Sequence, residues 1–338
     1  MKQINLSVYI SNYLSKYLPG IAGLSTNTIL SYRDMFRLLI TFYESELSIS
    51  PEKIQINNLN HDNILNFLKW LEENRGNSIS TRNIRLASIH AFSRYLMKKE
   101  PSCMAEIQKI LDIPYKKIRK GSIEYIDQDS MKILLELPDM ETKVGLRDAT
   151  LLSLLYDTGC RVQELCDLKP IDIRLNTPAT IKITGKGNKI RIVPILPSMA
   201  KLLEKYMESY NLNKDNLNFS PLFQNRMGEK LTRKGVSYIV DKYVEIAKEI
   251  RKGSFPERFT PHCFRHSKSM HLLQAGVNLI YIRDLLGHVD VKTTEIYARI
   301  DGEMKRKALE KGMNIIPEDG LPVWQENKSL LEWLNSLG

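Results

Sequence analysis

Residues 180–193 read TIKITGKGNKIRIV, and this stretch decides the class of fold. β-branched residues alternate along it on both sides of a glycine-rich turn, which is the pattern of a β-hairpin. The sequence around it has helical periodicity instead. Helices are predicted around 128–137, 145–157, 198–210, 232–250, 263–275, 278–286 and 291–299. The pattern predicts a mixed α/β domain over 125–310, with one small hairpin set among helices.

The hairpin turn, Gly185-Lys186-Gly187, could be mistaken for part of a nucleotide-binding loop. A phosphate-binding P-loop needs the spacing G-x-x-x-x-G-K-[ST] between a strand and a helix. This turn lacks that spacing and lies between two strands. The turn therefore does not predict ATP binding.

The first third of the chain is predicted to form a separate helical domain, residues 1–114. Apolar residues recur at helical spacing in four segments, which begin near Leu6, Ser25, Ile64 and Ser80. Four amphipathic helices in about 100 residues can share one core. Residues 115–124 are basic and contain Gly121, so they are predicted to be a linker. The tail, 311–338, is polar and ends in a short amphipathic helix over 329–337.

Composition narrows the class of protein. The chain has 338 residues, is 43% hydrophobic and carries a net charge of +10. These values fit globular domains and exclude a disordered chain. No apolar run is long enough for a membrane span or typical of a signal peptide, so a cytoplasmic protein is expected. The basic charge leaves nucleic acid, an anionic membrane and acidic proteins open as partners.

The cysteines do not form a recognisable metal motif. Cys160, Cys166 and Cys263 could be grouped with His262 and His266, but the paired short spacings of zinc sites are missing. The four cysteines are few for this length, which favours a reduced protein without structural disulfides. No metal site is predicted.

Three further segments carry residues that could act on an anion. Arg161 and Glu164 open a helix after a glycine turn, and His262, Arg265 and His266 follow Pro261 at a helix start. His288 follows a helix that ends at Gly287, and Tyr297 lies nine residues later. Each segment alone has an ordinary structural explanation: a surface Arg–Glu pair, a capped helix, or a half-buried tyrosine.

Together and in this order, the segments resemble the catalytic domain of the tyrosine recombinases, the phage integrase family. The resemblance covers roughly residues 125–300, and the four-helix region resembles the core-binding domain of that family. It implies a catalytic set made of Arg161, Lys186, His262, Arg265, His288 and Tyr297, supported by Glu164 and His266. The fold expected is therefore mainly α with a small β-sheet, made of a core-binding domain and a mixed α/β catalytic domain.

The resemblance also implies roles for these residues. Two arginines, Arg161 and Arg265, can hold the non-bridging oxygens of a phosphodiester, as expected for a transition state with growing negative charge. Tyr297 would be the nucleophile and Lys186 the proton donor to the leaving oxygen. His262 would transfer a proton and His288 would bind the phosphate. A phosphotyrosine keeps the energy of the broken bond, so neither ATP nor a metal ion is expected.

The implied partner is double-stranded DNA carrying specific recombination sites, bound by a homotetramer on two duplexes and aided by an accessory directionality protein. Phosphate or base contacts are expected from a set of polar and basic residues: Arg82, Asn83, Arg85, Lys116, Lys117, Arg119 and Lys120. The tail helix could pack on its own domain, but the resemblance favours docking on a neighbouring protomer. No membrane partner is expected.

Several functions remain open at this point. Within the family, the chain could integrate and excise a mobile element, which the long tail after Tyr297 favours, or resolve replicon dimers. A type IB topoisomerase has a similar site but needs no second duplex. A regulator that binds DNA without cutting it would be expected to lack some of the catalytic residues, and none is missing here.

Overall fold

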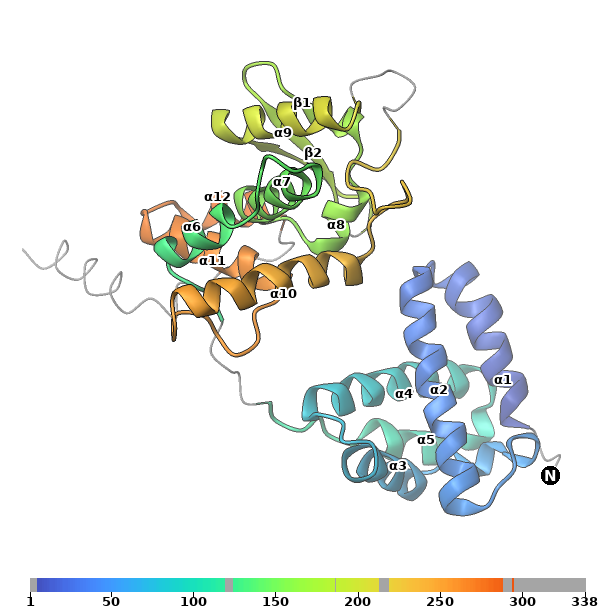
Figure 1. The fold of residues 1–338 in the computed structure, drawn as a ribbon. Helices are drawn as coiled ribbons and strands as arrows, with labels where there is room; N and C mark the ends of the chain where they lie inside the picture. The colour runs from blue at the N-terminus through green and yellow to red at the C-terminus, as the bar shows by residue number, and fades with distance from the viewer. Residues whose placement is uncertain (1–4, 119–123, 186, 213–218, 288–293, 295–338) are drawn as a thin grey trace, which may run out of the picture. The chain divides into compact units, whose positions relative to one another are not determined.

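The chain forms two compact units, Met1–Gly121 and Ser122–Gly338, drawn in Figure 1. The computed structural model describes residues 5–118, 124–185, 187–212, 219–287 and 294. The division between the units falls within the predicted linker, 115–124. Among the described residues, no helix is both long and apolar enough to cross a membrane.

In the described part of the first unit, the regular elements are helices, apart from one isolated β-bridge between Asn5 and Gln55. Its main elements are α1 (Leu6–Asn12), η1 (Tyr13–Ile21), α2 (Thr26–Leu47), α3 (His61–Glu73), α4 (Ile79–Lys99) and α5 (Met104–Leu111). The four predicted helical segments are present, the first one as α1 continued by the π-helix η1. Helix α5 was not predicted from the sequence. It packs on α3 and α4 and has only two buried apolar residues, Ile107 and Ile110, so its periodicity is too short to recognise.

Aromatic residues fill the core of the helical unit. Tyr13, Phe36 and Phe92 come from η1, α2 and α4 and are at most 2% exposed. The ring of Phe92 lies 5.2 Å from that of Tyr13 and 4.8 Å from that of Phe36, both edge to face. Such pairs stabilise a core beyond their buried area. The three helical segments are therefore tied together at one point.

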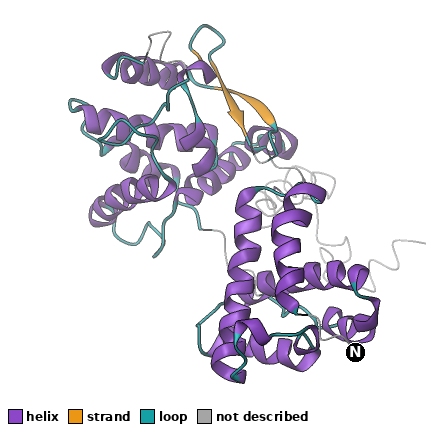
Figure 2. Cartoon of the chain, turned by 90° about the vertical axis from the view of Figure 1, so that its right-hand side faces the viewer, coloured by secondary structure: helices purple, strands orange, loops and turns teal. Residues whose placement is uncertain are grey.

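In the second unit, a small sheet lies at one side of a group of helices, as Figure 2 shows. Its elements are α6 (Gln128–Glu136), α7 (Lys143–Thr158), α8 (Val162–Asp167), β1 (Ile173–Arg174), β2 (Thr180–Thr184), β3 (Ile190–Pro194), α9 (Pro197–Ser209), α10 (Arg233–Ile250), α11 (Pro261–Gln274) and α12 (Leu279–Leu286). The predicted hairpin is β2 and β3. The two-residue strand β1 adds a third, antiparallel strand next to β2, and it is too short to have been predicted.

Strand register decides which hairpin side chains face the core. Ile181 pairs with Val193 and Ile183 with Arg191, whereas Lys182 pairs with Ile192. Ile181, Ile183 and Val193 are fully buried, while Ile190 and Ile192 are more than 60% exposed. Since side chains alternate between the two faces of a strand, Arg191 lies on the same face as the core residues.

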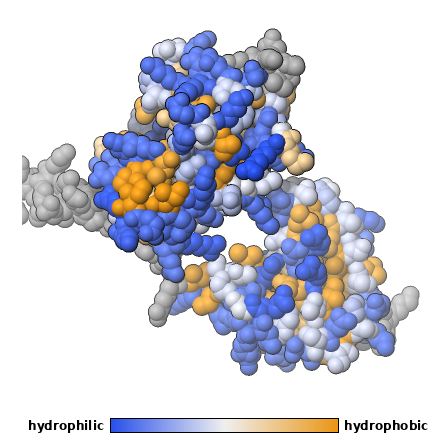
Figure 3. All heavy atoms as spheres, viewed as in Figure 1, coloured by the Kyte–Doolittle hydropathy of each residue, from blue (hydrophilic) through white to orange (hydrophobic). Residues whose placement is uncertain are grey.

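Helix α7 is the centre of the second unit, because Leu151, Leu152, Leu154 and Leu155 are all fully buried within the largest apolar cluster. It packs against both α9 and α11. The visible surface is mostly hydrophilic on both units, with separate apolar patches (Figure 3). The buried face of α7 thus positions its C-terminal end, where the candidate site begins.

Candidate active site

The turn from α7 to α8 brings Arg161 to the surface of the second unit. Gly159 caps α7 with a φ of 56°, in the left-handed region that favours glycine. A Cβ at this position would lie 2.6 Å from Cδ2 of Leu286 on α12, so the close approach of α12 also requires glycine. Arg161 then occupies the N-cap of α8 in an extended conformation, and its side chain is 39% exposed.

Glu164 holds the Arg161 residue by both its backbone and its side chain. Its Oε2 accepts the backbone N–H of Arg161 at 2.9 Å, and its Oε1 accepts Nη1 of the same residue at 2.8 Å. The Glu164 side chain is only 5% exposed. The supporting role expected of Glu164 therefore has a defined geometry, in which it orients the guanidinium of Arg161.

A second arginine, Arg191 on β3, shares the same carboxylate. Its Nη2 donates to Oε2 of Glu164 at 2.7 Å, and its Nε donates to the carbonyl oxygen of Leu285 at 3.0 Å. Burial alone would raise the pKa of Glu164, but the hydrogen bonds from Arg191 and Arg161 outweigh it and lower the pKa. Glu164 is therefore ionised at neutral pH.

Helix α11 contributes Arg265, the second arginine of the predicted phosphate clamp. Arg265 is 2% exposed. Its Nη1 donates to the carbonyl of Gly159 and its Nη2 to the carbonyl of Leu286, both at 2.7 Å. Leu286 ends α12, and the partial negative charge at a helix C-terminus favours a cation there. Arg265 thereby joins the α7–α8 turn, α11 and the end of α12.

His262 and His266 lie one turn apart on α11, with ring centroids 5.2 Å apart. Burial lowers the pKa of His262, and the charges of Arg265 and Arg161 lower it further. Burial also lowers the pKa of His266, which reaches about 4 with the effects of His262 and Arg265. Both imidazoles are therefore neutral at pH 7, and His262 has the protonation state of a proton acceptor.

The structure accordingly brings together five of the predicted residues, Arg161, Glu164, His262, Arg265 and His266. The other three, Lys186, His288 and Tyr297, lie outside the described residues. Gly185 and Gly287 come directly before Lys186 and His288 in the chain and are both described. A Cβ on Gly185 would lie 3.1 Å from Oε1 of Glu164, and one on Gly287 would lie 3.1 Å from Arg191.

Arg191 is the site residue that the sequence reading missed. The sequence carried no clear signal for it, because Arg191 alternates with Ile190 and Ile192 and shares the parity of Lys189, which favours an outward-facing side chain. Its partner, Glu164, is 27 residues away. Only the strand register and the exposure of Ile190 and Ile192 place Arg191 on the buried face.

Arg82 and Asn83, which were expected to contact DNA, hold residues 114–116 against α4. Arg82 is 4% exposed and donates from Nη1 to the carbonyl of Pro114 at 3.2 Å. The Asn83 side-chain amide donates to the carbonyl oxygen of Lys116 and accepts the backbone N–H of the same residue. The Lys116 ammonium pairs with Glu72 at 2.7 Å. We call residues 114–116 the strap. The burial of Arg82 argues against base reading by this residue.

The remaining expected DNA contacts are placed as follows. Arg85 donates from Nη1 to the carbonyl of Ser31 on α2 at 3.1 Å. Lys117 is exposed directly after the strap. Arg119 and Lys120 lie outside the described residues. The first two residues of the predicted linker, 115–116, are therefore attached to the helical unit.

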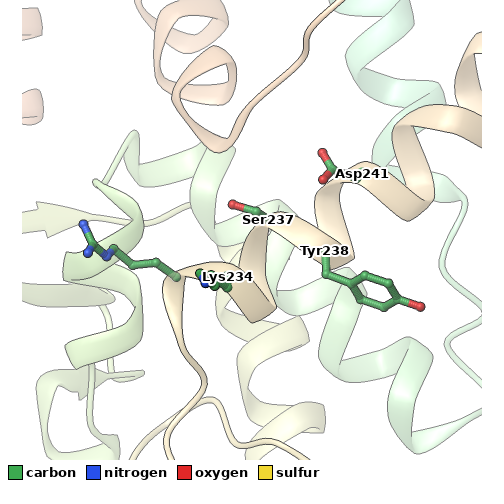
Figure 4. A pocket seen from close by; sticks show the side chains of 5 residues that line it. Lys234, Ser237, Tyr238 and Asp241 are labelled. Carbon is green, nitrogen blue, oxygen red and sulfur yellow. The ribbon is translucent and has the colours of Figure 1, made fainter. Parts of the chain in front are cut away.

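One polar surface was not anticipated. The first half of α10 lines a pocket with Lys234, Ser237, Tyr238 and Asp241, shown in Figure 4, together with Arg233. Tyr238 is 73% exposed. Two cations and an exposed aromatic ring on one helix can contact an anionic polymer. Within the described part of the chain, no group of three or more His, Cys, Asp or Glu side chains is arranged to hold a metal ion.

Comparison with protein families gives two matches that together cover most of the chain. Residues 124–304 match the phage integrase family, and residues 10–100 match the phage integrase N-terminal SAM-like domain. The first match alone covers more than half of the chain.

Curated relatives are similar over nearly the whole length. The chain is 33% identical over 337 residues to y4rC, an inferred integrase/recombinase of Sinorhizobium fredii, with 99% of both chains covered. It is 31% identical to the tyrosine recombinase XerC of Pelotomaculum thermopropionicum, covering 90% of this chain and 97% of the relative. It is 34% identical to XerD of Listeria monocytogenes, covering 82% and 89%.

Solved structures share the fold at lower identity. XerH bound to its difH substrate in a pre-cleavage complex matches 90% of this chain and 84% of its own, at 24% identity and a TM-score of 0.65. The Tn1549 transposon integrase in complex with transposon right end DNA matches 89% and 98%, at 17% identity and a TM-score of 0.69. These likenesses establish the arrangement of the fold.

Proposed function

Since the chain belongs to the phage integrase family and is a tyrosine-type site-specific recombinase that cleaves and rejoins DNA, we propose that it integrates and excises a mobile genetic element. The observation that carries the proposed chemistry is the convergence of Arg161 and Arg265 on one turn, beside a neutral His262. This arrangement supports a site that binds a phosphodiester and moves a proton.

The proposed reaction is a transesterification. The Tyr297 oxygen attacks the scissile phosphorus, forms a 3′-phosphotyrosine bond and breaks the bond to the 5′ oxygen. His262 takes the tyrosine proton, and Lys186 gives a proton to the departing 5′ oxygen. Arg161, Arg265 and His288 bind the non-bridging oxygens, which carry more negative charge in the transition state. Rejoining is the same reaction reversed on a second strand, through a Holliday junction.

Tyr297→Phe tests the nucleophile. A nicked duplex, made from the DNA that flanks the gene, traps the covalent product because the short 5′ fragment diffuses away. The wild type should form an adduct that survives denaturation, whereas Tyr297→Phe should bind the same duplex without forming one. An adduct at the wild-type level in the variant would exclude Tyr297 as the nucleophile.

We also propose that the reaction needs neither a metal ion nor ATP. The charge of the transition state is balanced by the guanidinium groups of Arg161 and Arg265, and the phosphotyrosine retains the energy of the broken bond. Adduct formation should therefore be unchanged in excess EDTA and without nucleotide. Loss of the adduct in EDTA, with recovery on adding Mg²⁺, would contradict this mechanism.

The proposed assembly is a homotetramer on two DNA duplexes, with an accessory directionality protein. XerH and the Tn1549 integrase were solved with DNA, which supports DNA as the partner here. The tail helix, 329–337, lies outside the described residues, and we propose that it docks on a neighbouring protomer. A chain truncated after Gly320 should bind DNA but fail to assemble, as measured by light scattering on paired sites. Intact assembly would refute the docking.

The relatives divide between integrases and Xer recombinases, so dimer resolution is the second candidate function. The match to y4rC covers 99% of both chains, which favours the mobile-element role. Expression in cells that carry the element should yield a circular junction detectable by sequencing across its ends. Absence of the junction, with recombination of a plasmid-dimer reporter instead, would favour dimer resolution.

A further inference from the structure

One buried ion pair connects several parts of the active site. Arg191 and Glu164 approach to 2.7 Å, and their side chains are 11% and 5% exposed. The pair joins β3 to α8, and the second Arg191 bond, to the Leu285 carbonyl, joins β3 to α12. Three elements that are distant in sequence are thereby held by a single guanidinium.

The Arg191 side chain also lies close to Gly185 and Gly287. Its Nη1 lies 3.7 Å from the place of a Cβ on Gly185, and both Nη1 and Cδ lie 3.1 Å from that of Gly287. Neither position has room for a side chain without displacing Arg191 or Glu164. The chain therefore packs tightly on this pair directly before Lys186 and directly before His288.

The pair also controls the partner of Arg161. The Glu164 carboxylate uses Oε1 for the Arg161 side chain and Oε2 for both Arg191 and the Arg161 backbone. Arg191 is much less exposed than Arg161, which is 39% exposed. Arg191 thus provides the buried counter-charge of Glu164, and Arg161 can turn its outer N–H groups towards a phosphate.

We propose that Arg191 is a positioning residue for DNA cleavage, which holds Glu164, and through it Arg161, together with the glycines that precede Lys186 and His288. This inference rests on the proposed function. Arg191 itself does not touch the DNA. It acts because a displacement of about 1 Å in a catalytic group can reduce a rate by about 10²-fold.

Loss of a buried charge can also unfold the protein, so a matched control is needed. Arg147 on α7 provides one in the same unit: it is also 11% exposed, pairs with the buried Asp148 at 2.7 Å, and donates to a backbone carbonyl, that of Gln224. Arg191→Gln and Arg147→Gln therefore remove equivalent buried pairs. Only the first lies at the site.

Both variants are compared at a temperature at which circular dichroism shows them folded. The assay is the single-turnover rate of adduct formation on the nicked duplex at saturating protein, with DNA affinity measured separately. Arg191→Gln should slow adduct formation by about 10²-fold. Its DNA affinity should stay within about threefold of the wild type, because no phosphate contact is removed. Arg147→Gln should cleave at the wild-type rate.

Two further variants distinguish positioning from general structural loss. Arg191→Lys keeps a charge for Glu164 but not the planar fork, so its rate should lie between those of the wild type and Arg191→Gln. Adding Arg191→Gln to Glu164→Gln should slow the reaction little beyond Glu164→Gln alone, because both changes break one network.

The inference is overturned if Arg191→Gln and Arg147→Gln slow adduct formation equally. It is also overturned if the rate of the double variant, Arg191→Gln with Glu164→Gln, is reduced by the product of the two single reductions. It is also overturned if affinity falls while the rate at saturation is unchanged. A wild type that forms no adduct would instead refute the proposed function, and with it this inference. An active wild type with an unaffected Arg191→Gln refutes the inference alone.

Discussion

Gly159→Ala should lower the free energy of unfolding of the second unit for two separate reasons, backbone strain and a steric clash. The first part is the backbone: Gly159 has a φ of 56°, and the left-handed conformation costs a residue with a Cβ about 1–2 kcal/mol. The second part is a steric clash, because the new Cβ would lie 2.6 Å from Cδ2 of Leu286, which is fully buried. Overpacking of a filled core costs about 1–3 kcal/mol.

Gly253→Ala separates the two parts. Gly253 has a φ of 78°, yet a Cβ there would meet no atom within 4 Å. This control therefore contains the backbone cost of about 1–2 kcal/mol without the clash. The total for Gly159→Ala is about 2–5 kcal/mol, so the difference between the variants measures the contact between Gly159 and Leu286.

The assay is urea unfolding followed by circular dichroism, with the free energy of unfolding taken from the transition of the second unit. A Leu286→Ala background completes the test. It removes Cδ2, so Gly159→Ala should cost no more there than Gly253→Ala does. Equal costs for Gly159→Ala and Gly253→Ala in the wild-type background would refute the close approach of α12 to the turn. Equal costs would also count against the hydrogen bond from Arg265 to the Leu286 carbonyl as an explanation of how the site is held together.

Three other outcomes are expected. Asn83→Ala should release the strap from α4. Trypsin should then cut after Lys116 about tenfold faster, because cleavage follows the population of molecules in which the strap is detached. An unchanged cleavage rate would show that the Asn83 amide does not hold the strap. The pKa of His262 is lowered from 6.5 and that of His266 to about 4, so the unfolded state binds more protons in this range. The free energy of unfolding should therefore fall as pH decreases from 6.5 towards 4, and a flat urea midpoint between pH 7.5 and 5 would contradict these shifts. Lys234→Ala on α10 should reduce the slope of DNA affinity against salt by about one ion, whereas an unchanged slope would exclude a phosphate contact.

The described helices and the hairpin could be predicted because their patterns are local, whereas the predicted helices 291–299 and 329–337 fall, apart from residue 294, outside the described residues. Each of these signals depends only on neighbouring residues: apolar residues at helical spacing, Pro261 at a helix start and Gly287 at a helix end. Short elements such as α5 and β1 were missed for the same reason, since eight or two residues hold too little of a period. The burial of Arg82 could not be predicted, because it depends on residues 114–116, about 30 positions later.

The sequence by itself determined the fold class, the family and the division into two parts, and it identified the residues that we propose bind and cleave a phosphodiester. Each of these residues alone has an ordinary structural explanation, so it was their order along the chain that indicated the family. Only the tertiary structure decided how those groups are held: Arg191 on Glu164, and Arg265 between Gly159 and Leu286. A buried ion pair needs a partner at hydrogen-bond distance, and it is the packing of α7, α11, α12 and the hairpin that sets this distance.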